Sequence, residues 1–452
     1  MRKNKKNDIF ISYEKTYRRR RKLSNTLFGV IIVILLAAGL GIGTYYVVSF
    51  QMGQNNCINS QISDTENGEL NSVNNDNGDN GEDILSQAEI TETPTPYITN
   101  DNIDEDEEPN DIEVVEEVDI RVPVEVKGIY VTSTAIKNKR DELINITETT
   151  EINAMVIDVK DDNGRITYNM DSPKAHEIDA TTNAVLDMED FIQTLRDKEI
   201  YPIARIVAFK DPYLAEQKHE LALKNKDGSL YRDNNGEGWI NPYNTEVWDY
   251  IIEISAKAAE IGFMEIQFDY IRFSTGRGMS EVDFGPLAEE KSKEDIILEF
   301  TRYAYEQLKP LGVFVSADVY GTIISSSIDG GLVGQNYVEM ARHLDYICPM
   351  IYPSHFGPGN YGVEHPDLEP FKIIRKVLTA SRTNLDIILP GEHKAIVRPW
   401  LQDFTATWVT PHREYGGEEL REQIDSVYGA GYKEWLLWDA SCNYSVDGLK
   451  KE

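Results

Sequence analysis

The sequence predicts an α/β protein built as a (β/α)8 TIM barrel, preceded by a single N-terminal transmembrane helix and a disordered acidic linker. Three observations lead to this prediction. Short apolar runs alternate with amphipathic stretches eight times after Arg121, one long uncharged run lies near the start, and the charge divides the 452 residues into three segments. Strands that alternate with helices imply a parallel sheet with right-handed crossovers, and eight such units in about 330 residues fit a closed barrel.

The charge differs strongly from one segment to the next. Residues 1–50 carry ten Lys and Arg and two acids, whereas residues 51–120 carry twenty acids and no Lys or Arg. The net charge of the whole chain is −32, which leaves −20 on residues 121–452. So acidic a protein lacks the basic face that phosphate binding needs, and we expect no nucleic acid partner.

The uncharged run extends from Leu27 to Val48, and a helix of this length rises about 33 Å, enough to cross a bilayer core. Five cations, Arg18 to Lys22, precede it and are expected to stay in the cytoplasm, so the remainder of the chain is predicted to be extracytoplasmic. A cleaved signal peptide is the alternative, although no clear small-x-small site follows the run. We therefore predict a single-pass protein of the cell membrane with the lipid bilayer as one partner.

The domain organisation follows from these segments. We predict a cytoplasmic basic tail (1–22), a transmembrane signal anchor (23–49), a disordered acidic linker (50–120) and a barrel domain (121–452). The linker is rich in Asn, Asp, Glu, Gly, Ser and Thr and has few aromatic residues. Such a composition cannot bury enough apolar surface to offset the entropy of ordering.

The barrel domain begins with apolar runs that predict eight strands: 126–131, 154–159, 203–208, 265–270, 313–319, 346–351, 396–401 and 435–438. The intervening periodicity predicts helices over 137–149, 182–198, 212–223, 245–260, 291–308, 335–344, 368–381 and 417–428. An open doubly wound sheet is the alternative, but its first strand usually leads into a glycine-rich turn. Here the first strand ends in Val131-Thr132-Ser133-Thr134.

Carboxylates and aromatic residues gather at the predicted strand ends, where barrel enzymes carry their chemistry. Asp269 follows the apolar run Ile266-Gln267-Phe268, and Asp318 ends the next strand. Sugar hydrolysis needs two carboxyls, and adjacent strands place two such groups roughly 5–10 Å apart. We therefore predict Asp269 and Asp318 as the catalytic pair.

Each of these roles has a structural alternative. Asp269 could cap the next helix or pair with Arg272, three residues further on, and Arg272 could hold Asp269 ionised by lowering its pKa. Asp318 could position substrate hydroxyls or order the turn at Tyr320 and Gly321.

A further set of polar and aromatic side chains is predicted to bind substrate, since aromatic faces stack on pyranose rings. This set contains Asp158, Arg205, Trp239, Asn241, Tyr270, Arg272, Tyr320, Tyr352, His355, Trp400, Gln402, Trp438 and Asp439. Most aromatic residues on barrel strands are core, so we expect about half of them to contact a ligand. We predict no cofactor and no metal, because His343, His355 and His365 fall in no metal-ligand motif.

Five segments carry a resemblance to a known family: Lys127–Thr132, Gly238–Pro242, Phe268–Phe273, Arg398–Phe404 and Leu436–Ser441. Over about residues 125–445 the chain resembles a bacterial family described as putative glycoside hydrolases, TIM barrels distantly similar to the α-amylase-type hydrolases. In related barrels the acid at the end of strand four is the principal catalytic carboxylate, which implies Asp269. The α-amylase pattern has a glutamate on strand five, where this chain has Asp318.

The predicted function is that of a membrane-anchored extracytoplasmic glycoside hydrolase acting on a cell-wall or surface polysaccharide, or on oligosaccharides derived from it. Two alternatives are a non-catalytic glycan-binding barrel and a metal-dependent carbohydrate deacetylase. The negative charge favours a neutral or cationic glycan over a strongly acidic polymer.

Overall fold

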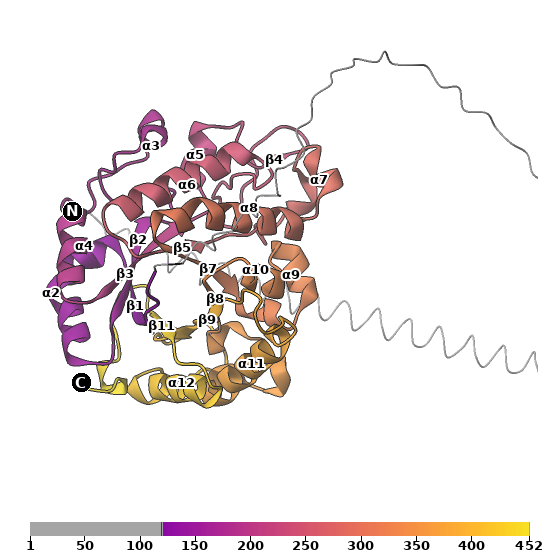
Figure 1. Ribbon diagram of the computed structural model, residues 1–452. Coiled ribbons are helices and arrows are strands. Elements are labelled where there is room, and N and C mark those ends of the chain that lie inside the picture. Colours follow the sequence, from indigo (N-terminus) through magenta and orange to yellow (C-terminus); the bar gives the residue numbers. More distant parts are fainter. Residues whose placement is uncertain (1–118, 120, 452) are drawn as a thin grey trace, which may run out of the picture. The chain divides into compact units, whose positions relative to one another are not determined.

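The computed structural model describes residues 119 and 121–451. One parallel sheet runs in the order β10-β11-β1-β2-β3-β5-β7-β8-β9, and β10 also pairs with β8 through Trp400 and Met350. This extra pairing closes the sheet into a barrel, with the strands at the centre and the helices around them (Figure 1). The predicted (β/α)8 barrel is confirmed.

The strands agree closely with the apolar runs. They are β1 (Lys127–Val131), β2 (Ala154–Lys160), β3 (Tyr201–Val207), β5 (Glu265–Asp269), β7 (Phe314–Tyr320), β8 (Tyr346–Met350), β9 (Ile396–Val397), β10 (Trp400–Gln402) and β11 (Trp435–Trp438). All residues of β2 and β3 are buried, as expected for parallel strands covered on both faces. A short antiparallel pair, β4 (Lys224–Asn225) and β6 (Val282–Asp283), lies outside the barrel sheet.

The seventh strand of the barrel differs from its prediction as one continuous run. It is divided into β9 and β10 at Arg398 and Pro399. Proline has no N–H to donate to a ladder, so it interrupts a central strand. The Pro399 carbonyl still accepts a hydrogen bond from the amide of Leu436 at 2.9 Å, which continues the pairing of β10 with β11.

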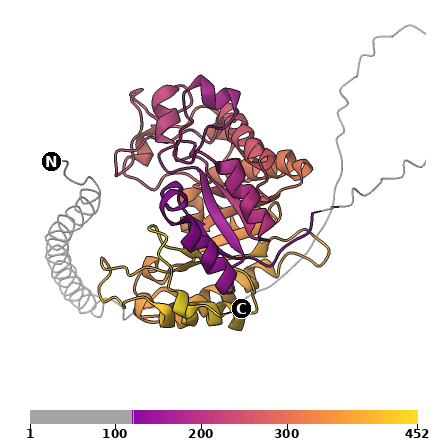
Figure 2. The ribbon, with the colours of Figure 1, turned by 90° about the vertical axis from the view of Figure 1, so that its left-hand side faces the viewer.

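The longer helices cover the barrel in chain order. They are α2 (Ser133–Thr149), α4 (Met188–Asp197), α6 (Thr245–Glu260), α8 (Lys293–Leu308), α11 (Pro370–Leu385) and α12 (Gly417–Gly429). Shorter helices are α3 (Pro173–Glu177), α5 (Pro212–Gln217), α7 (Leu287–Glu290), α9 (Ser327–Val333) and α10 (Tyr337–Ala341). Figure 2 views the barrel from the side on which α2 and α4 lie.

The helix boundaries have clear local causes. At α8, Ser292 and Asp295 form a reciprocal capping box, which sets the first turn two residues after the predicted start. The predicted helix over 335–344 is only the short α10, and the side chain of Asn336 caps its first turn. The predicted helix over 245–260 coincides with α6, whose cap is Asn244.

An ion-pair cluster fills the barrel near the start of its strands. Arg398 contacts Glu265 and Glu434, each at 2.8 Å, and its guanidinium lies 3.7 Å from the centre of the Tyr346 ring. Ser316 donates to Glu265 at 2.5 Å. We call these residues, apart from Tyr346, the lower cluster; they are buried, and they belong to the packed interior.

The predicted transmembrane anchor and acidic linker lie outside the described residues. Within residues 121–451, no helix combines the length and apolarity needed to span a bilayer.

Candidate active site

Asp269 is the last residue of β5 and stands at the C-terminal rim of the barrel. Its Oδ2 accepts hydrogen bonds from Arg205 Nε at 3.0 Å and Arg205 Nη2 at 2.5 Å. Its Oδ1 accepts from the backbone amide of Tyr270 at 2.6 Å. The side chain is thereby held in one orientation by a cation and an amide, and the residue is 7% exposed.

The cation that pairs with Asp269 is therefore Arg205 on β3, and the hypothesis that Arg272 fills this role is wrong. Arg272 donates instead to the carbonyl oxygen of Phe273 at 2.8 Å. The chain turns at Tyr270, which has a φ of 51°, in the left-handed region. This turn ends the strand one residue before its predicted end and sends Arg272 away from the Asp269 carboxylate.

Asp318 lies on β7, the strand next to β5. Phe268 pairs with Ala317, so the following residues, Asp269 and Asp318, come next in register. Trp400 Nε1 donates to Asp318 Oδ1 at 2.6 Å. Asp318 is only 2% exposed, and burial together with the negative charge of Asp269 raises the pKa of its carboxyl well above the ordinary value.

The second oxygen of Asp318 is the one that remains available. No described residue donates to Oδ2, yet Oδ2 is not among the fully sealed, unpartnered polar atoms of the described chain. It therefore retains a small accessible surface. The two carboxyls thus differ in state: Asp269 is bound by a guanidinium, whereas Asp318 is surrounded by conditions that favour its protonated form.

Arg205 joins Asp269 to a second carboxylate. Its Nη1 donates to Asp158 Oδ1 at 2.7 Å, and the Tyr130 hydroxyl donates to Asp158 Oδ2 at 2.6 Å. Burial raises the pKa of Asp158 to about 6 despite the nearby guanidinium. We call Arg205, Asp158, Asp269 and Tyr130 the rim cluster.

Aromatic rings surround the rim cluster. Tyr130 stacks on Trp438 with centroids 4.1 Å apart, and Trp400 meets Trp438 edge-on at 5.7 Å. Tyr352 is buried, and burial and the charges of Asp318 and Asp269 raise the pKa of its hydroxyl. The predicted residues Trp400, Trp438 and Tyr352 are thus brought together beside the two candidate catalytic carboxyls.

A second aromatic group lies beyond Tyr352. Tyr352 contacts His355 and Phe404 edge-on, with centroids 4.9 and 5.9 Å away. Phe404 stacks in parallel with Trp408 at 5.9 Å, and Trp408 is 47% exposed. Phe404 and Trp408 form an exposed aromatic platform that the sequence interpretation missed.

Arg272, Trp239, Tyr270 and Tyr320 form another group at the rim. The Arg272 guanidinium carbon lies 5.1, 4.9 and 4.6 Å from the ring centres of Trp239, Tyr270 and Tyr320 respectively. Trp239 is itself fixed through a hydrogen bond from Nε1 to Asp233 at 3.1 Å. Three predicted aromatic residues therefore surround the guanidinium of the fourth, Arg272.

Three predicted substrate-binding residues use their side chains to fix the backbone. Asn241 donates to the carbonyl of Phe284 at 3.0 Å. Gln402 donates to the carbonyl of Phe404 at 3.0 Å and accepts from the amide of Ser354 at 3.1 Å. Asp439 accepts from the amides of residues 441 and 443, at 2.8 and 3.0 Å. Their observed contacts stabilise loops at the rim.

Two rim residues besides the platform escaped prediction. Tyr130 lies within the first predicted strand, where its alternation with Ile129 signals an inward-facing hydroxyl. Asp403 directly follows β10; its Oδ2 accepts from the amide of Ser445 at 2.9 Å, and burial raises its pKa to about 6. Its place at a strand end was the available signal.

The described residues contain no group of three or more His, Cys, Asp or Glu side chains arranged to hold a metal ion. His355 packs against aromatic rings, and His365 lies 3.9 Å from Glu364.

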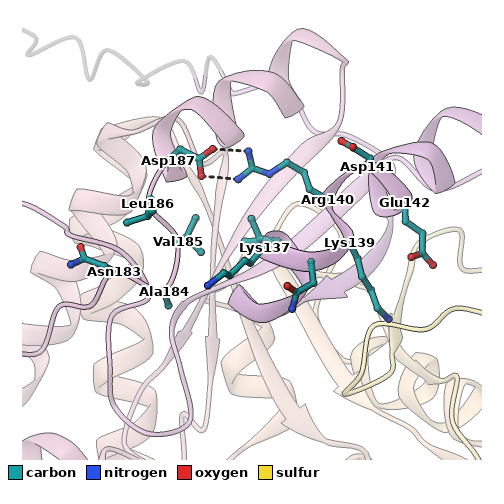
Figure 3. Close-up of a pocket in the computed structure, with 12 residues that line it drawn as sticks. Lys137, Lys139, Arg140, Asp141, Glu142, Asn183, Ala184, Val185, Leu186 and Asp187 are labelled. Carbon is teal, nitrogen blue, oxygen red and sulfur yellow. Dashed lines mark hydrogen bonds and ion pairs between the residues drawn. The ribbon is translucent and has the colours of Figure 1, made fainter.

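A separate pocket of about 480 Å³ opens between α2 and residues 183–187 (Figure 3). Arg140 spans it with two hydrogen bonds of 2.7 Å to Asp187. None of the predicted site residues lines this pocket, so it is distinct from the candidate active site.

A closed (β/α)8 barrel with two carboxyls from neighbouring strands, set among aromatic rings at its C-terminal rim, has the architecture of a barrel glycoside hydrolase. The family comparison agrees. Residues 128–444 match the family described as "Putative glycosyl hydrolase domain", and the chain belongs to this family. The resemblance inferred from the five sequence segments is confirmed.

Two solved structures are similar to this chain, and the second of them shares its fold. A hypothetical protein from Ruminiclostridium thermocellum ATCC 27405 is 40% identical, with a TM-score of 0.39; the match covers 42% of this chain and 97% of that one. The PgaB (BpsB) glycoside hydrolase domain from Bordetella bronchiseptica is 13% identical, with a TM-score of 0.52, and the match covers 70% of this chain and 94% of that one. No curated protein matches the chain.

Proposed function

We propose that this protein is a membrane-anchored extracytoplasmic glycoside hydrolase that cleaves a cell-wall or surface polysaccharide with Asp269 and Asp318. The observation that carries the proposal is the unequal environment of two carboxyls in neighbouring strands. Asp269 is bound by Arg205, whereas the pKa of Asp318 is raised by burial and by the charge of Asp269. Glycoside hydrolysis uses such a pair, one carboxyl protonated and the other ionised.

Asp318 is the proton donor in this proposal. Its Oδ1 is occupied by Trp400 Nε1, which leaves Oδ2 to carry the proton and meet the glycosidic oxygen. Protonation of that oxygen lets the sugar that keeps it leave as an alcohol. Positive charge develops meanwhile on the ring of the other sugar, whose bond to this oxygen breaks.

Asp269 stabilises that positive charge and completes the reaction, either as nucleophile or as the base that activates water. The stereochemical outcome depends on which of these roles it takes. Arg205 keeps the Asp269 carboxylate oriented, and the second Arg205 partner, Asp158, fixes the guanidinium from the other side. Trp438 is partly exposed and backed by the buried ring of Tyr130, so Trp438 is the ring on which a pyranose can stack.

The proposed location rests on the N-terminal segments. The run from Leu27 to Val48 is long enough to span a bilayer, and the cations before it favour a cytoplasmic N-terminus. Residues 51–120 would reach roughly 240 Å if fully extended. A barrel on such a tether has access to glycans well above the membrane surface.

The test is the release of reducing ends from crude wall glycans by the full-length protein in detergent. We expect release by the wild type and none by Asp269→Asn, with the melting temperature almost unchanged. Binding to insoluble wall without any release would support the glycan-binding alternative. Release of acetate that stops on chelation would support the deacetylase alternative.

A further inference from the structure

Arg272 differs from every other buried cation of the described chain. The buried Lys and Arg residues are Lys160, Arg205, Lys210, Arg272 and Arg398. Four of them have a carboxylate oxygen within 3.1 Å. Arg272, which is only 7% exposed, forms no ion pair with any residue that the structure describes.

The protein compensates this charge only in part. A buried guanidinium without a counter-charge loses several kcal/mol of solvation. The rings of Trp239, Tyr270 and Tyr320 recover part of this loss through cation–π contact, and one N–H reaches the Phe273 carbonyl. A positive charge held in this way is prepared for an anion from outside the described chain.

The remaining donors of Arg272 are accessible. Apart from the bond to Phe273, no described residue accepts from its guanidinium. The sealed and unpartnered nitrogens of the described chain include Arg398 Nη2 and Arg421 Nη1, but no atom of Arg272. Its free N–H groups therefore face accessible surface, and a planar guanidinium fork matches a carboxylate with two parallel hydrogen bonds.

The neighbours of Arg272 place it next to the proposed catalytic pair. Tyr270 directly follows Asp269 in the chain, and Tyr320 lies two residues after Asp318 on the same face of β7. The rings of both tyrosines contact the guanidinium. Arg272 therefore lies beside the two chain segments that carry Asp269 and Asp318.

We propose that Arg272 is the receptor for a sugar carboxylate, either of a uronic acid or of a carboxyalkyl ether, in a subsite beside Asp269 and Asp318. This inference rests on the proposed function and names its substrate class. The other buried cations of this rim, Arg205 and Lys210, are already paired with Asp158, Asp162 and Asp269, and Asp403 adds a further acid. One receptor cation in an acidic rim selects a glycan with widely spaced carboxylates and disfavours a dense polyanion.

The test compares crude wall glycan with the same glycan after its carboxyl groups have been reduced to hydroxymethyl groups by carbodiimide activation and borohydride. The full-length wild type in detergent should cleave the native glycan with a kcat/KM about tenfold or more above that for the reduced glycan. Arg272→Gln should cleave the native glycan about tenfold more slowly than the wild type does and should not distinguish the two glycans. Arg277→Gln removes an exposed charge from the same loop and should retain the wild-type preference.

The outcomes separate this inference from the proposed function. Equal cleavage of both glycans by the wild type would overturn the carboxylate receptor and leave the hydrolase intact. Cleavage of neither would overturn both. If Arg272→Gln melts early, Arg272→Lys keeps the charge without the fork, and the wild-type comparison of the two glycans still decides the matter.

Discussion

Two arginines at opposite ends of one barrel each join several carboxylates, two at Arg398 and three at Arg205, and their surroundings give the two clusters different roles. In the lower cluster, Arg398 pairs with Glu265 and Glu434, each at 2.8 Å, and all three residues are buried. Burial raises the pKa of Glu434 as well, but both acids of this cluster bind the same guanidinium, at the end of the barrel opposite the strand ends that carry chemistry. In the lower cluster, buried ion pairs take the place of apolar side chains in the interior of the barrel.

The rim cluster uses the same residue types four positions further along β5. Arg205 pairs with Asp158 and Asp269, but the neighbouring Asp318 has a raised pKa and an accessible oxygen. Glu265 and Asp269 lie on the same strand and face. The comparison teaches that the position along a barrel strand, more than the residue type, decides whether a buried carboxylate is structural or reactive.

The largest expected effect comes from a matched pair of substitutions on β5. Asp269→Asn should lower kcat at least about a thousandfold, because it removes the catalytic carboxyl that Arg205 holds in place. Glu265→Gln makes the same chemical change in the lower cluster and should lower stability while the folded molecules keep most of their activity. Reducing-end assays beside thermal melts check both. Equal activity losses in the two variants would contradict the distinction between the clusters.

The next effect is on stability. Arg398→Met leaves Glu265 and Glu434 buried without their cation, which should lower the free energy of unfolding by about 3–5 kcal/mol. Guanidinium chloride unfolding of the full-length protein measures this. A variant as stable as the wild type would show that the lower cluster does not support the barrel.

The third prediction concerns Asp403, a rim acid for which the described residues supply no arginine partner. Burial raises its pKa in the folded protein to about 6, above the ordinary value of 3.8. Proton binding at Asp403 therefore stabilises the fold fully below about pH 4, and this stabilisation is lost as the pH rises through 6. At pH 7.5 the free energy of unfolding of Asp403→Asn should exceed that of the wild type by about 2–3 kcal/mol.

The pH dependence supplies the control for Asp403. Below pH 4 the two proteins should have nearly equal stability, because the wild-type carboxyl is then neutral. An Asp403→Asn variant that is less stable than the wild type at pH 7.5 would place the carboxylate in a favourable contact instead.

The smallest effect concerns how far the rim extends outward. Trp408→Ala should raise KM for long glycan chains about three- to tenfold and leave cleavage of short oligosaccharides unchanged, because the Phe404–Trp408 platform lies beyond Tyr352. A matched control is Phe371→Ala, an exposed ring on α11. Equal effects of Trp408→Ala on long and short chains would assign Trp408 to packing.

Local patterns were sufficient to predict the barrel. Apolar runs identified every barrel strand because parallel strands are buried on both faces and read as continuous hydrophobic segments. The break at Pro399 could also have been predicted, since proline rarely continues a central strand. The placement of Asp269 and Asp318 at the rim followed from the strand ends themselves.

The electrostatic partners could not be predicted from the same patterns. Arg272 is near Asp269 in sequence, whereas the actual partner, Arg205, lies 64 residues away on the neighbouring strand. The register of β3 against β5 decides this pairing, and spacing along one segment does not encode it. The platform was missed for a similar reason: Phe404 and Trp408 lie on an irregular segment after β10, where no periodicity marks the exposed side.

The most direct test of the carboxylate pair is the titration of Asp318 followed by carbon-detected NMR of its carboxyl group, in the wild type and in Asp269→Asn. Asp318 should titrate well above the ordinary value for aspartate in the wild type. Its pKa should fall in Asp269→Asn, because a neighbouring negative charge is removed while Arg205 remains. An Asp318 carboxyl that titrates at its ordinary value, or that does not respond to the substitution, would contradict a proton held for glycoside cleavage.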